Sequence, residues 1–495
     1  MLAKGIDIGL TETILEDLNA GLYDADTRFE VVGVPSVDGK TIVSTGSTMR
    51  YEMSERIVNE RLAALGIEES RGSKLPDGNI FFDKPALIDI GERLYVKTAW
   101  GVLNGGSATS YADRKKNSSL GPGVFEAIRN GFELLAPLCE GRPKGITPAY
   151  LNPDGSPGES FLVLKMRATL LQALRYIERF GKAVRPVLPF FQMTSDGTDT
   201  ALASAYVGYR NHPWLAPLIM ATGVDPTEPR SAKQPLIAAF THGSEGKPRQ
   251  IFDRAWSKTD SSLALPGGHG QSFRVLASVY RNLLASGYRY AWLGNVDNIA
   301  YIPDPAELAV MALSGSEAAF EFSYRTPVDI KGGILVITKT GRKTVVDIGQ
   351  AITFDAVRAM EADGQKVLFN CATCILDLEC IVPKLDEIAR KIPVRVSDQD
   401  KDAGRYSQAE QSAWEVIGLI DDPLGFAVEK GNRFIAAKLL AETLLASGAV
   451  AASGAVAGQL PPDVELIARM MSSGLRNVLS GPCGLKLKDG KWIPQ

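Results

Sequence analysis

Apolar and polar positions follow two periods along this chain, one typical of buried strands and one typical of amphipathic helices. Short apolar runs rich in β-branched and aromatic residues, at 94–102, 184–193 and 290–293, predict buried strands. Apolar residues recur at helical spacing in 161–180 and 276–284. Because strands and helices alternate, the pattern predicts an α/β fold in which helices connect the strands of a sheet.

Other regions complete the predicted elements. Residues 318–324 are expected to form another strand, and residues 334–338 and 344–348 are expected to form a hairpin. None of these three strands suggests chemistry. Residues 1–93 are expected to be helical and irregular, with one helix capped by Ser54. We find no candidate catalytic group in that N-terminal part.

A glycine loop follows the predicted strand 94–102. It contains Gly105 and Gly106, which allow the backbone to approach a ligand closely, and its free N–H groups suit phosphate oxygens or a nucleobase edge. In an open α/β sheet, ligands bind at the carboxyl ends of the strands. One such loop can be a simple tight turn. Similar loops at 265–270 and 329–333 strengthen the prediction of a ligand site.

Asp297 lies in the polar run Asn295-Val296-Asp297-Asn298, directly after the predicted strand 290–293. A carboxylate at a strand end suits a Mg²⁺ ion held over the phosphates of a nucleotide. The alternative interpretation is an Asx residue that initiates a turn.

Length and charge limit the classes of function. A chain of 495 residues should hold two or three domains. Its 54 basic and 57 acidic residues give a net charge of −3, so nucleic acid is not an expected partner. The N-terminus lacks a signal-peptide pattern and no apolar run is long enough to span a bilayer. We therefore expect a soluble, cytoplasmic protein without a membrane partner.

Several common motifs are absent from the sequence. It contains neither a P-loop nor a dinucleotide-binding Gly-x-Gly-x-x-Gly, which disfavours an NTPase or a dehydrogenase. Its three histidines are scattered, so a histidine-rich metal site is not expected. The five cysteines do not form a secreted disulfide pattern. Cys371 and Cys374 have redox spacing, but we expect buried structural cysteines rather than a metal or redox site.

Eight short stretches, in this order along the chain, resemble the UDP-glucose pyrophosphorylase family, the eukaryotic-type uridylyltransferases. They are Leu103-Asn104-Gly105-Gly106, Pro143-Lys144, Met193-Thr194-Ser195, Pro266-Gly267-Gly268-His269-Gly270, Asn295-Val296-Asp297-Asn298, Asp329-Ile330-Lys331-Gly332-Gly333, Phe369-Asn370 and Arg433-Phe434-Ile435-Ala436-Ala437-Lys438.

The resemblance implies a Rossmann-like nucleotidyltransferase core with a mixed sheet, plus N-terminal and short C-terminal sections. The implied bounds are 1–93 for the N-terminal section, 94–385 for the core with an insertion at about 110–142, and 386–495 for the C-terminal section carrying Lys438. The implied enzyme joins UTP to a sugar 1-phosphate, most simply glucose 1-phosphate, with Mg²⁺ as cofactor, and releases pyrophosphate. An in-line attack on the α-phosphorus needs positioning and positive charge more than an acid–base pair.

The same resemblance implies a role for individual residues. The nucleotide would be held by Leu103, Asn104, Gly105, Gly106, His242 and Gly268. The sugar would be held by His269, Asn295, Gly333 and Asn370. Lys144 and Lys438 would be the catalytic cations that neutralise the phosphates, and Asp297 would bind Mg²⁺.

The chain departs from the family pattern in four places. Ala108 replaces the third loop glycine, His242 stands near the uracil-reading glutamine, and Ala372 replaces a sugar-contacting asparagine. The stretch between Thr109 and Lys144 is also longer, and its basic run 114–116 is expected to be solvated rather than bound to phosphate. The departures leave open another sugar 1-phosphate, or a non-catalytic protein that binds sugar nucleotides.

Two observations weigh on these alternatives. The retained Lys144, Asp297 and Lys438 favour the enzyme over the non-catalytic protein, because a pure binder has little use for a full phosphate clamp. The segment after Lys438 is too short for the left-handed β-helix through which family members assemble, so the oligomeric state stays open.

Overall fold

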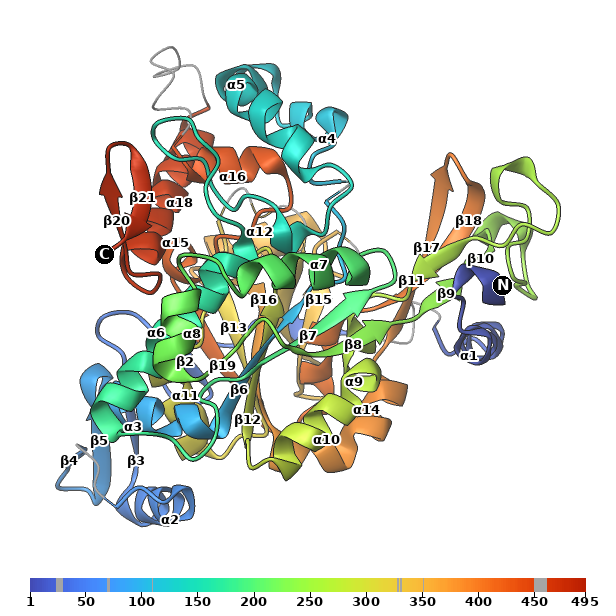
Figure 1. The fold of residues 1–495 in the computed structure, drawn as a ribbon. Coiled ribbons are helices and arrows are strands. Elements are labelled where there is room, and N and C mark those ends of the chain that lie inside the picture. Colours follow the sequence, from blue (N-terminus) through green and yellow to red (C-terminus); the bar gives the residue numbers. More distant parts are fainter. Residues whose placement is uncertain are drawn as a thin grey trace.

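The computed structural model describes residues 1–23, 30–68, 72–108, 110–326, 329, 332–349, 351–448 and 461–495. In this part of the chain the centre is an eleven-stranded sheet (Figure 1). Its main path is β2 (Ile42–Ser44), β19 (Leu424–Val428), β13 (Ala318–Tyr324), β16 (Leu368–Asp377), β12 (Tyr290–Asn295), β6 (Thr98–Leu103), β7 (Phe190–Ser195) and β8 (Arg230–Gln234). The strands β1 (Val31–Gly33), β14 (Gly333–Thr338) and β15 (Lys343–Asp347) extend it from β16.

One reversed strand makes this sheet mixed. The pairs β12–β6, β6–β7, β7–β8, β13–β19 and β19–β2 are parallel. Strand β16 is antiparallel to both of its neighbours on the path, β12 and β13. The carboxyl ends of the parallel strands and the beginning of β16 therefore lie at the same edge. The predicted α/β fold with a mixed sheet is confirmed.

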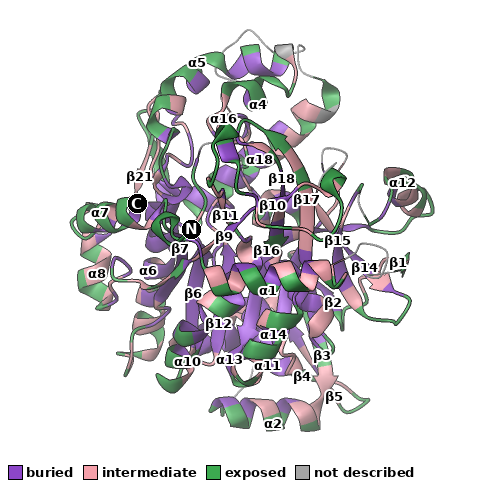
Figure 2. Cartoon of the chain, turned by 90° about the vertical axis from the view of Figure 1, so that its right-hand side faces the viewer, coloured by how far each residue is buried: buried purple, intermediate pink, exposed green. Residues whose placement is uncertain are grey.

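Burial on both faces explains the apolar sequences of the central strands. Every residue of β6 and β7 is buried, and Figure 2 shows the sheet interior as the most buried part of the molecule. Trp100 of β6 and Trp292 of β12 are register partners. Gly101 has a packing reason, because a Cβ atom there would lie 2.2 Å from the ring of Phe191 on β7.

Helices connect the central strands in sequence. Between β6 and β7 are α4 (Arg114–Ser118), α5 (Pro122–Cys139) and α6 (Phe161–Phe180), and between β7 and β8 are α7 (Asp199–Tyr209) and α8 (Ala216–Thr222). Before β12 are α9 (Ser272–Val275) and α10 (Ala277–Ala285), and α11 (Pro305–Ser314) leads to β13. Ser160 caps α6 by accepting a hydrogen bond from the N–H of Val163, and Asp304 caps α11. The arrangement confirms helical crossovers.

Smaller units lie around the sheet. One three-stranded sheet contains β3 (Arg50–Ser54), β5 (Asn79–Asp83) and β4 (Ser73–Lys74), beside α2 (Glu55–Leu65) and α3 (Lys84–Leu94). Another contains β10 (Phe240–Thr241), β18 (Gly404–Gln411) and β17 (Val394–Lys401), near α1 (Ile8–Asn19) and the pair β9 (Leu236–Ala238) and β11 (Ala264–Pro266). The remaining helices are α12 (Phe354–Ala362), α13 (Leu378–Ile381), α14 (Leu385–Lys391), α15 (Lys430–Arg433), α16 (Leu440–Ala446) and α18 (Pro462–Ser480), and the chain ends in the hairpin β20 (Leu485–Lys488) and β21 (Lys491–Pro494).

The N-terminal part is richer in strands than we expected. The capped helix is present, because Ser54 accepts a hydrogen bond from the N–H of Ile57 at the start of α2. Yet β1 to β5 also lie there, and β1 and β2 join the central sheet. Strand β19 joins it from the C-terminal side. The central sheet therefore crosses both predicted boundaries of the core, 94 and 385.

Two strands begin later than their apolar sequences suggested. Strand β7 begins at Phe190 and not at 184, where Val184 is 92% exposed. Pro186 and Pro189 interrupt that run, and proline cannot donate to a ladder of hydrogen bonds. Strand β6 begins at Thr98 because Leu94 still belongs to α3.

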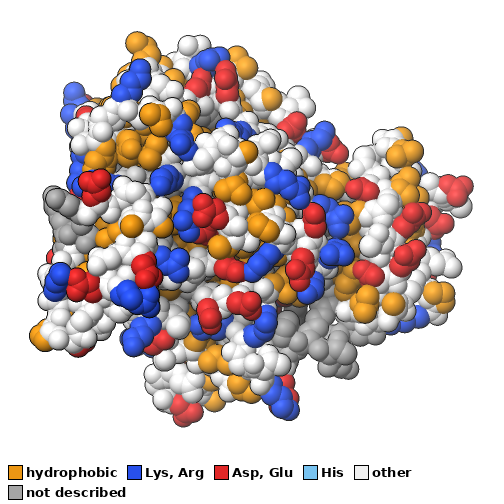
Figure 3. Space-filling view, turned by 90° about the horizontal axis from the view of Figure 1, so that it is seen from below, with side chains coloured by type: hydrophobic (Ala, Val, Ile, Leu, Met, Phe, Trp, Pro, Cys, Tyr) orange, Lys and Arg blue, Asp and Glu red, His pale blue; other side chains and the backbone are white. Residues whose placement is uncertain are grey.

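The surface shows no dominant charge on the face drawn in Figure 3. Acidic and basic side chains are interspersed there with apolar ones. The exposed basic run of the insertion lies on α4, where Arg114 forms an ion pair with Glu133. Among the described residues, no helix combines the length and apolar character needed to cross a bilayer.

Candidate active site

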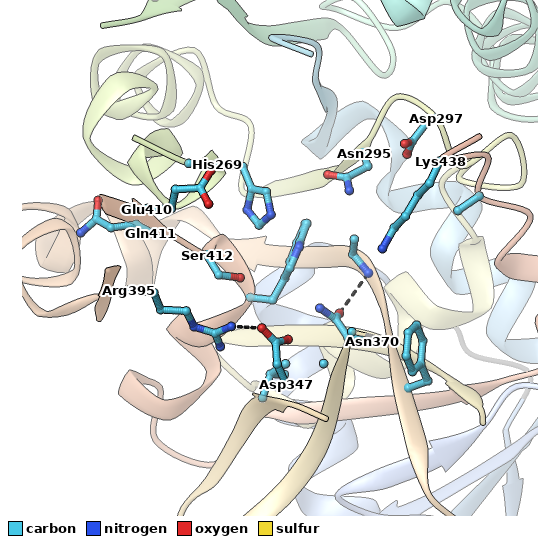
Figure 4. A pocket seen from close by; sticks show the side chains of 18 of the residues that line it. His269, Asn295, Asp297, Asp347, Asn370, Arg395, Glu410, Gln411, Ser412 and Lys438 are labelled. Atoms are coloured by element: carbon cyan, nitrogen blue, oxygen red, sulfur yellow. Dashed lines mark hydrogen bonds and ion pairs between the residues drawn. The ribbon is translucent and has the colours of Figure 1, made fainter. Parts of the chain in front are cut away.

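A cavity of about 580 Å³ lies at the sheet edge where the parallel strands end (Figure 4). Its lining includes seven of the residues proposed from the sequence, namely Gly268, His269, Asn295, Asp297, Gly333, Asn370 and Lys438. Asn295 ends β12, Gly333 begins β14 and Asn370 lies near the start of β16. The mixed sheet thus brings together residues that are up to 170 positions apart, from Gly268 to Lys438.

Lys144 and Asp297 form the central ion pair of this region. The Lys144 Nζ lies 2.9 Å from the Asp297 Oδ2, and both side chains keep some exposure, 11% and 18%. The Lys144 Nζ also lies 4.8 Å from the centre of the Tyr111 ring. The Lys144 N–H donates to the carbonyl of Gly106, which joins the ion pair to the first glycine loop.

The first glycine loop divides into a buried and an accessible half. Leu103 ends β6, and Asn104 is fully buried with its side chain donating to Oε1 of Gln192. Gly106 is exposed, and a Cβ atom added there would meet nothing within 4 Å. A protein partner therefore accounts for the Nδ2 of Asn104, whereas the backbone of Gly106 is open to a ligand.

Gln234, which the sequence analysis did not single out, contacts the second glycine loop although it is not among the cavity-lining residues. It ends β8, and its Nε2 donates to the carbonyl of Gly268 at 2.7 Å and to Oε1 of Gln271 at 2.8 Å. Its Oε1 would lie 3.5 Å from a Cβ atom at Gly105. Gln234 thus lies between the two glycine loops. A search for polar residues at every predicted strand end would have found it.

His242, which was expected beside the nucleobase, lies near β17 in this structure. His242 follows β10 and caps a short 3₁₀ helix, Gly243–Glu245, by accepting a hydrogen bond from the N–H of Ser244. Its Nε2 lies 3.7 Å from Asp398 of β17. His242 is not among the cavity-lining residues, because β9 carries the chain away between Gln234 and His242.

The backbone conformation and the packing at position 268 both require glycine. Its φ is 80°, and a Cβ atom there would lie 2.4 Å from the carbonyl oxygen of Gln411. The next residue, His269, accepts a hydrogen bond on Nδ1 from the N–H of Ala413 at 3.0 Å, so its Nε2 carries the proton. Burial lowers the pKa of His269 to about 4, with the charge of Lys438 acting in the same direction. His269 is therefore a neutral hydrogen-bond donor at neutral pH.

The opposite end of the cavity contains charged residues that the sequence did not single out. Arg395 of β17 pairs with Asp347, the last residue of β15, and its Nη2 lies 2.9 Å from Oε1 of Glu415. Figure 4 shows Arg395 and Asp347 side by side at this end. The predicted hairpin β14–β15 exists, and Asp347, for which the sequence suggested no chemistry, lines the cavity.

A bulge in β16 shapes the floor near Asn370. The register between β13 and β16 shifts at this point, and Ala372 has a φ of 55°. The Ala372 N–H donates to Oδ1 of Asn370 at 3.0 Å, the dashed contact in Figure 4. Cys371 and Cys374 are buried free thiols on this strand, which confirms the expected burial.

Lys438 enters the cavity from the C-terminal part of the chain. It precedes α16, and its side chain is exposed and directed toward the cavity in Figure 4. The N–H of the preceding residue, Ala437, donates to the carbonyl of Asp297 at 3.2 Å. Asp297 is thus linked to Lys144 through an ion pair and to the segment of Lys438 through a backbone hydrogen bond. Asp297 and Lys438 line the cavity, whereas Lys144 is not among the lining residues.

Asp297 is the best candidate in the cavity for a metal ligand. Among the described residues, no three carboxylates, histidines or cysteines gather as a metal cluster would require. Mg²⁺ is commonly held by one or two carboxylates together with substrate phosphates and water. The partly exposed Asp297 carboxylate beside Lys144 fits that mode of binding.

Comparison with known proteins agrees with the resemblance carried by the sequence motifs. The family profile described as "UTP–glucose-1-phosphate uridylyltransferase" matches residues 248–455. A protein of that description from Astragalus penduliflorus is 26% identical over 216 residues, covering 42% of this chain and 45% of the relative. These matches make the chain similar to the UDP-glucose pyrophosphorylase family over less than half of its length.

Other comparisons point to the same similarity. The uridylyltransferase from Solanum tuberosum is 28% identical over 182 residues, covering 36% of this chain and 38% of the relative. The chain thus spans less than half the length of these curated relatives. The fold resembles the crystal structure of a UDP-glucose phosphorylase from Trypanosoma brucei, with a TM-score of 0.54 and 16% identity over 90% of this chain and 76% of that one. The profile match contains Asp297 and Lys438 but begins after Lys144.

Proposed function

We propose that this protein is a UTP–sugar-1-phosphate uridylyltransferase. The observation that carries the proposal is the Lys144–Asp297 ion pair, with Nζ 2.9 Å from Oδ2, beside a cavity that Lys438 enters. Two cations and one carboxylate at the carboxyl ends of the parallel strands suit a triphosphate and a second phosphate. The similarity of residues 248–455 to the uridylyltransferase family profile supports the same reaction.

The two glycine loops offer a place for the nucleobase. Gly105 and Gly106 expose backbone on one side, and Gly268 lies on the other, held by Gln234. Gln234 can turn its amide toward a base edge, which gives it the role first expected of His242. The phosphates of UTP would then extend toward Lys144 and Asp297.

The sugar phosphate would occupy the opposite part of the cavity. Asn295, Gly333 and Asn370 offer amide and backbone groups there, and His269 offers the Nε2 proton. Asp347 can accept hydrogen bonds from sugar hydroxyls while Arg395 holds its carboxylate in place. Glucose 1-phosphate is the first sugar to test.

The reaction needs no covalent enzyme intermediate. An oxygen of the sugar phosphate forms a bond to the α-phosphorus of UTP, and the bond between that phosphorus and the α–β bridging oxygen breaks. Pyrophosphate leaves with the electron pair, and the products are UDP-sugar and pyrophosphate. Lys144 and Lys438 neutralise the charge that accumulates on the phosphate oxygens. Mg²⁺ held by Asp297 and the phosphates would supply further positive charge.

The test is turnover by the purified protein. UTP and other nucleoside triphosphates are each combined with glucose, galactose, N-acetylglucosamine and glucuronic acid 1-phosphates in the presence of Mg²⁺, and pyrophosphate release is measured. We expect the greatest release with UTP and a hexose 1-phosphate, and none after addition of excess EDTA. Tight binding of UDP-sugar without pyrophosphate release in any combination would overturn the proposal in favour of the non-catalytic alternative.

A further inference from the structure

A lysine lies buried below the loop that carries Asp297. Lys165 of α6 is 1% exposed, and its Nζ donates to the carbonyls of Asn298 at 2.5 Å and Tyr301 at 3.0 Å. The same Nζ lies 4.8 Å from the centre of the Tyr301 ring. Among the residues that the structure describes, no carboxylate forms an ion pair with Lys165. Its charge is compensated mainly by two backbone carbonyls.

Such an environment is costly for an ammonium group. Burying a charge without an ionic partner is unfavourable, and an apolar side chain of similar length is often tolerated at least as well. Burial lowers the pKa of Lys165 to about 7, and the negative charge of Asp297 acts against that shift. Packing of the core alone therefore gives little reason for a lysine at this position. Its hydrogen bonds to the loop that carries Asp297 give a specific reason.

The loop after β12 and the segment before Lys438 are joined through Asn298. The Asn298 side chain donates to the carbonyl of Arg433 at 2.9 Å and accepts from the N–H of Ile435 at 3.0 Å. The N–H of Ala437 then donates to the carbonyl of Asp297. Lys165 holds the carbonyl of the same Asn298, at the junction of the two segments.

We propose that Lys165 is a positioning residue for Asp297 and Lys438. It contacts neither residue, and it acts by fixing the backbone of Asn298 and Tyr301 from below. With both carbonyls held, Asp297 and Lys438 keep their separation when two negatively charged substrates enter. This inference rests on the proposed uridylyltransferase function, in which these two side chains face the phosphates.

The same helix provides a matched control. Arg167, two positions along α6, is 6% exposed and also has no ion pair among the described residues. It donates to the carbonyls of Cys483, Trp214 and Gly484, away from the cavity. Lys165→Met and Arg167→Met therefore each remove one buried cation from backbone carbonyls. Only the first removes it from the loop that carries Asp297.

The experiment compares both variants with the wild type below their melting temperatures. We expect Lys165→Met to lower kcat at least tenfold, with a smaller change in KM for UTP, and Arg167→Met to keep kcat within twofold. Hydrogen–deuterium exchange should become faster at 295–301 and 433–438 in Lys165→Met and stay unchanged there in Arg167→Met. This second readout does not depend on activity.

Three outcomes would overturn the positioning role. The first is a folded Lys165→Met variant with kcat and exchange as in the wild type. The second is an equal loss of kcat in both variants, which would indicate a general effect of packing. If Lys165→Met does not fold, Lys165→Gln, which keeps an amide hydrogen-bond donor, takes its place. The third outcome is failure of both variants to fold, which would make Lys165 a determinant of folding instead. An inactive wild type would refute the proposed function, which is a separate result.

Discussion

The Nζ of Lys144 lies 2.9 Å from the Oδ2 of Asp297, across 153 positions of sequence. Lys144 comes from the connection between β6 and β7, and Asp297 follows β12. Since β6 and β12 are parallel neighbours, their carboxyl ends meet and bring the two side chains together. The contact places a cation directly beside a carboxylate that lines the cavity.

Asp297→Asn should lower kcat at least about a hundredfold while leaving the fold intact, because it removes a negative charge but keeps the size of the side chain. The measurements are turnover at saturating UTP and a Mg²⁺ titration, with circular dichroism to check folding. Near wild-type turnover at ordinary Mg²⁺ concentrations would refute the assigned role of Asp297.

Lys438→Ala should lower kcat strongly and shift the melting temperature little, because its side chain is exposed. Lys438→Arg should restore only part of the activity, since a planar guanidinium differs from a compact ammonium. Lys115→Ala is the control, because Lys115 is also an exposed lysine but lies on α4. Equal activity of the Lys438→Ala and Lys115→Ala proteins would leave Lys144 as the principal cation.

Gln234→Ala should reduce the preference for UTP over other nucleoside triphosphates by roughly tenfold, because a site built around a hydrogen bond loses discrimination when the partner is removed. His242→Ala should leave this preference within twofold, since His242 contacts Ser244 and Asp398 rather than a glycine loop. The comparison uses kcat/KM for each nucleotide. The opposite pattern would restore His242 as the residue that selects the base.

Arg395→Met should raise KM for the sugar 1-phosphate by about tenfold and change KM for UTP little, because Asp347 loses the partner that orients it. Glu415 loses the same guanidinium, so the melting temperature should also fall. The exposed pair of Arg342 with Asp421 provides the control variant Arg342→Met. A uniform rise in both KM values would argue against a role in sugar binding.

His269 should make stability depend on pH between its unfolded pKa of about 6.5 and its folded pKa of about 4. In that window the unfolded chain holds a proton on this imidazole and the folded chain does not, so the free energy of unfolding falls as the pH falls. The contribution is roughly 3 kcal/mol at most, from about 1.4 kcal/mol per pKa unit. Denaturant unfolding at several pH values should show a weaker dependence in His269→Gln than in the wild type. Identical slopes would refute this account.

Much of the site was predictable because its signals are local. A glycine loop, an Asn-x-Asp run after an apolar strand and a lysine after Arg433 can each be recognised in a few consecutive residues. Seven of the residues recognised in this way line one cavity. The helix caps at Ser54 and Ser160 are similarly local, because a cap depends on hydrogen bonds within one turn.

The rest was decided by tertiary structure. Arg395 and Asp347 meet only because β15 and β17 reach the same cavity from different sheets, and nothing in either short sequence indicates the other. The order of strands also placed Gln234, rather than His242, between the glycine loops and brought β2 and β19 into the core. Local sequence determines which residues form a strand and which polar groups follow it. Which strand ends become neighbours depends on the packing of the whole apolar core, a property that no short segment contains.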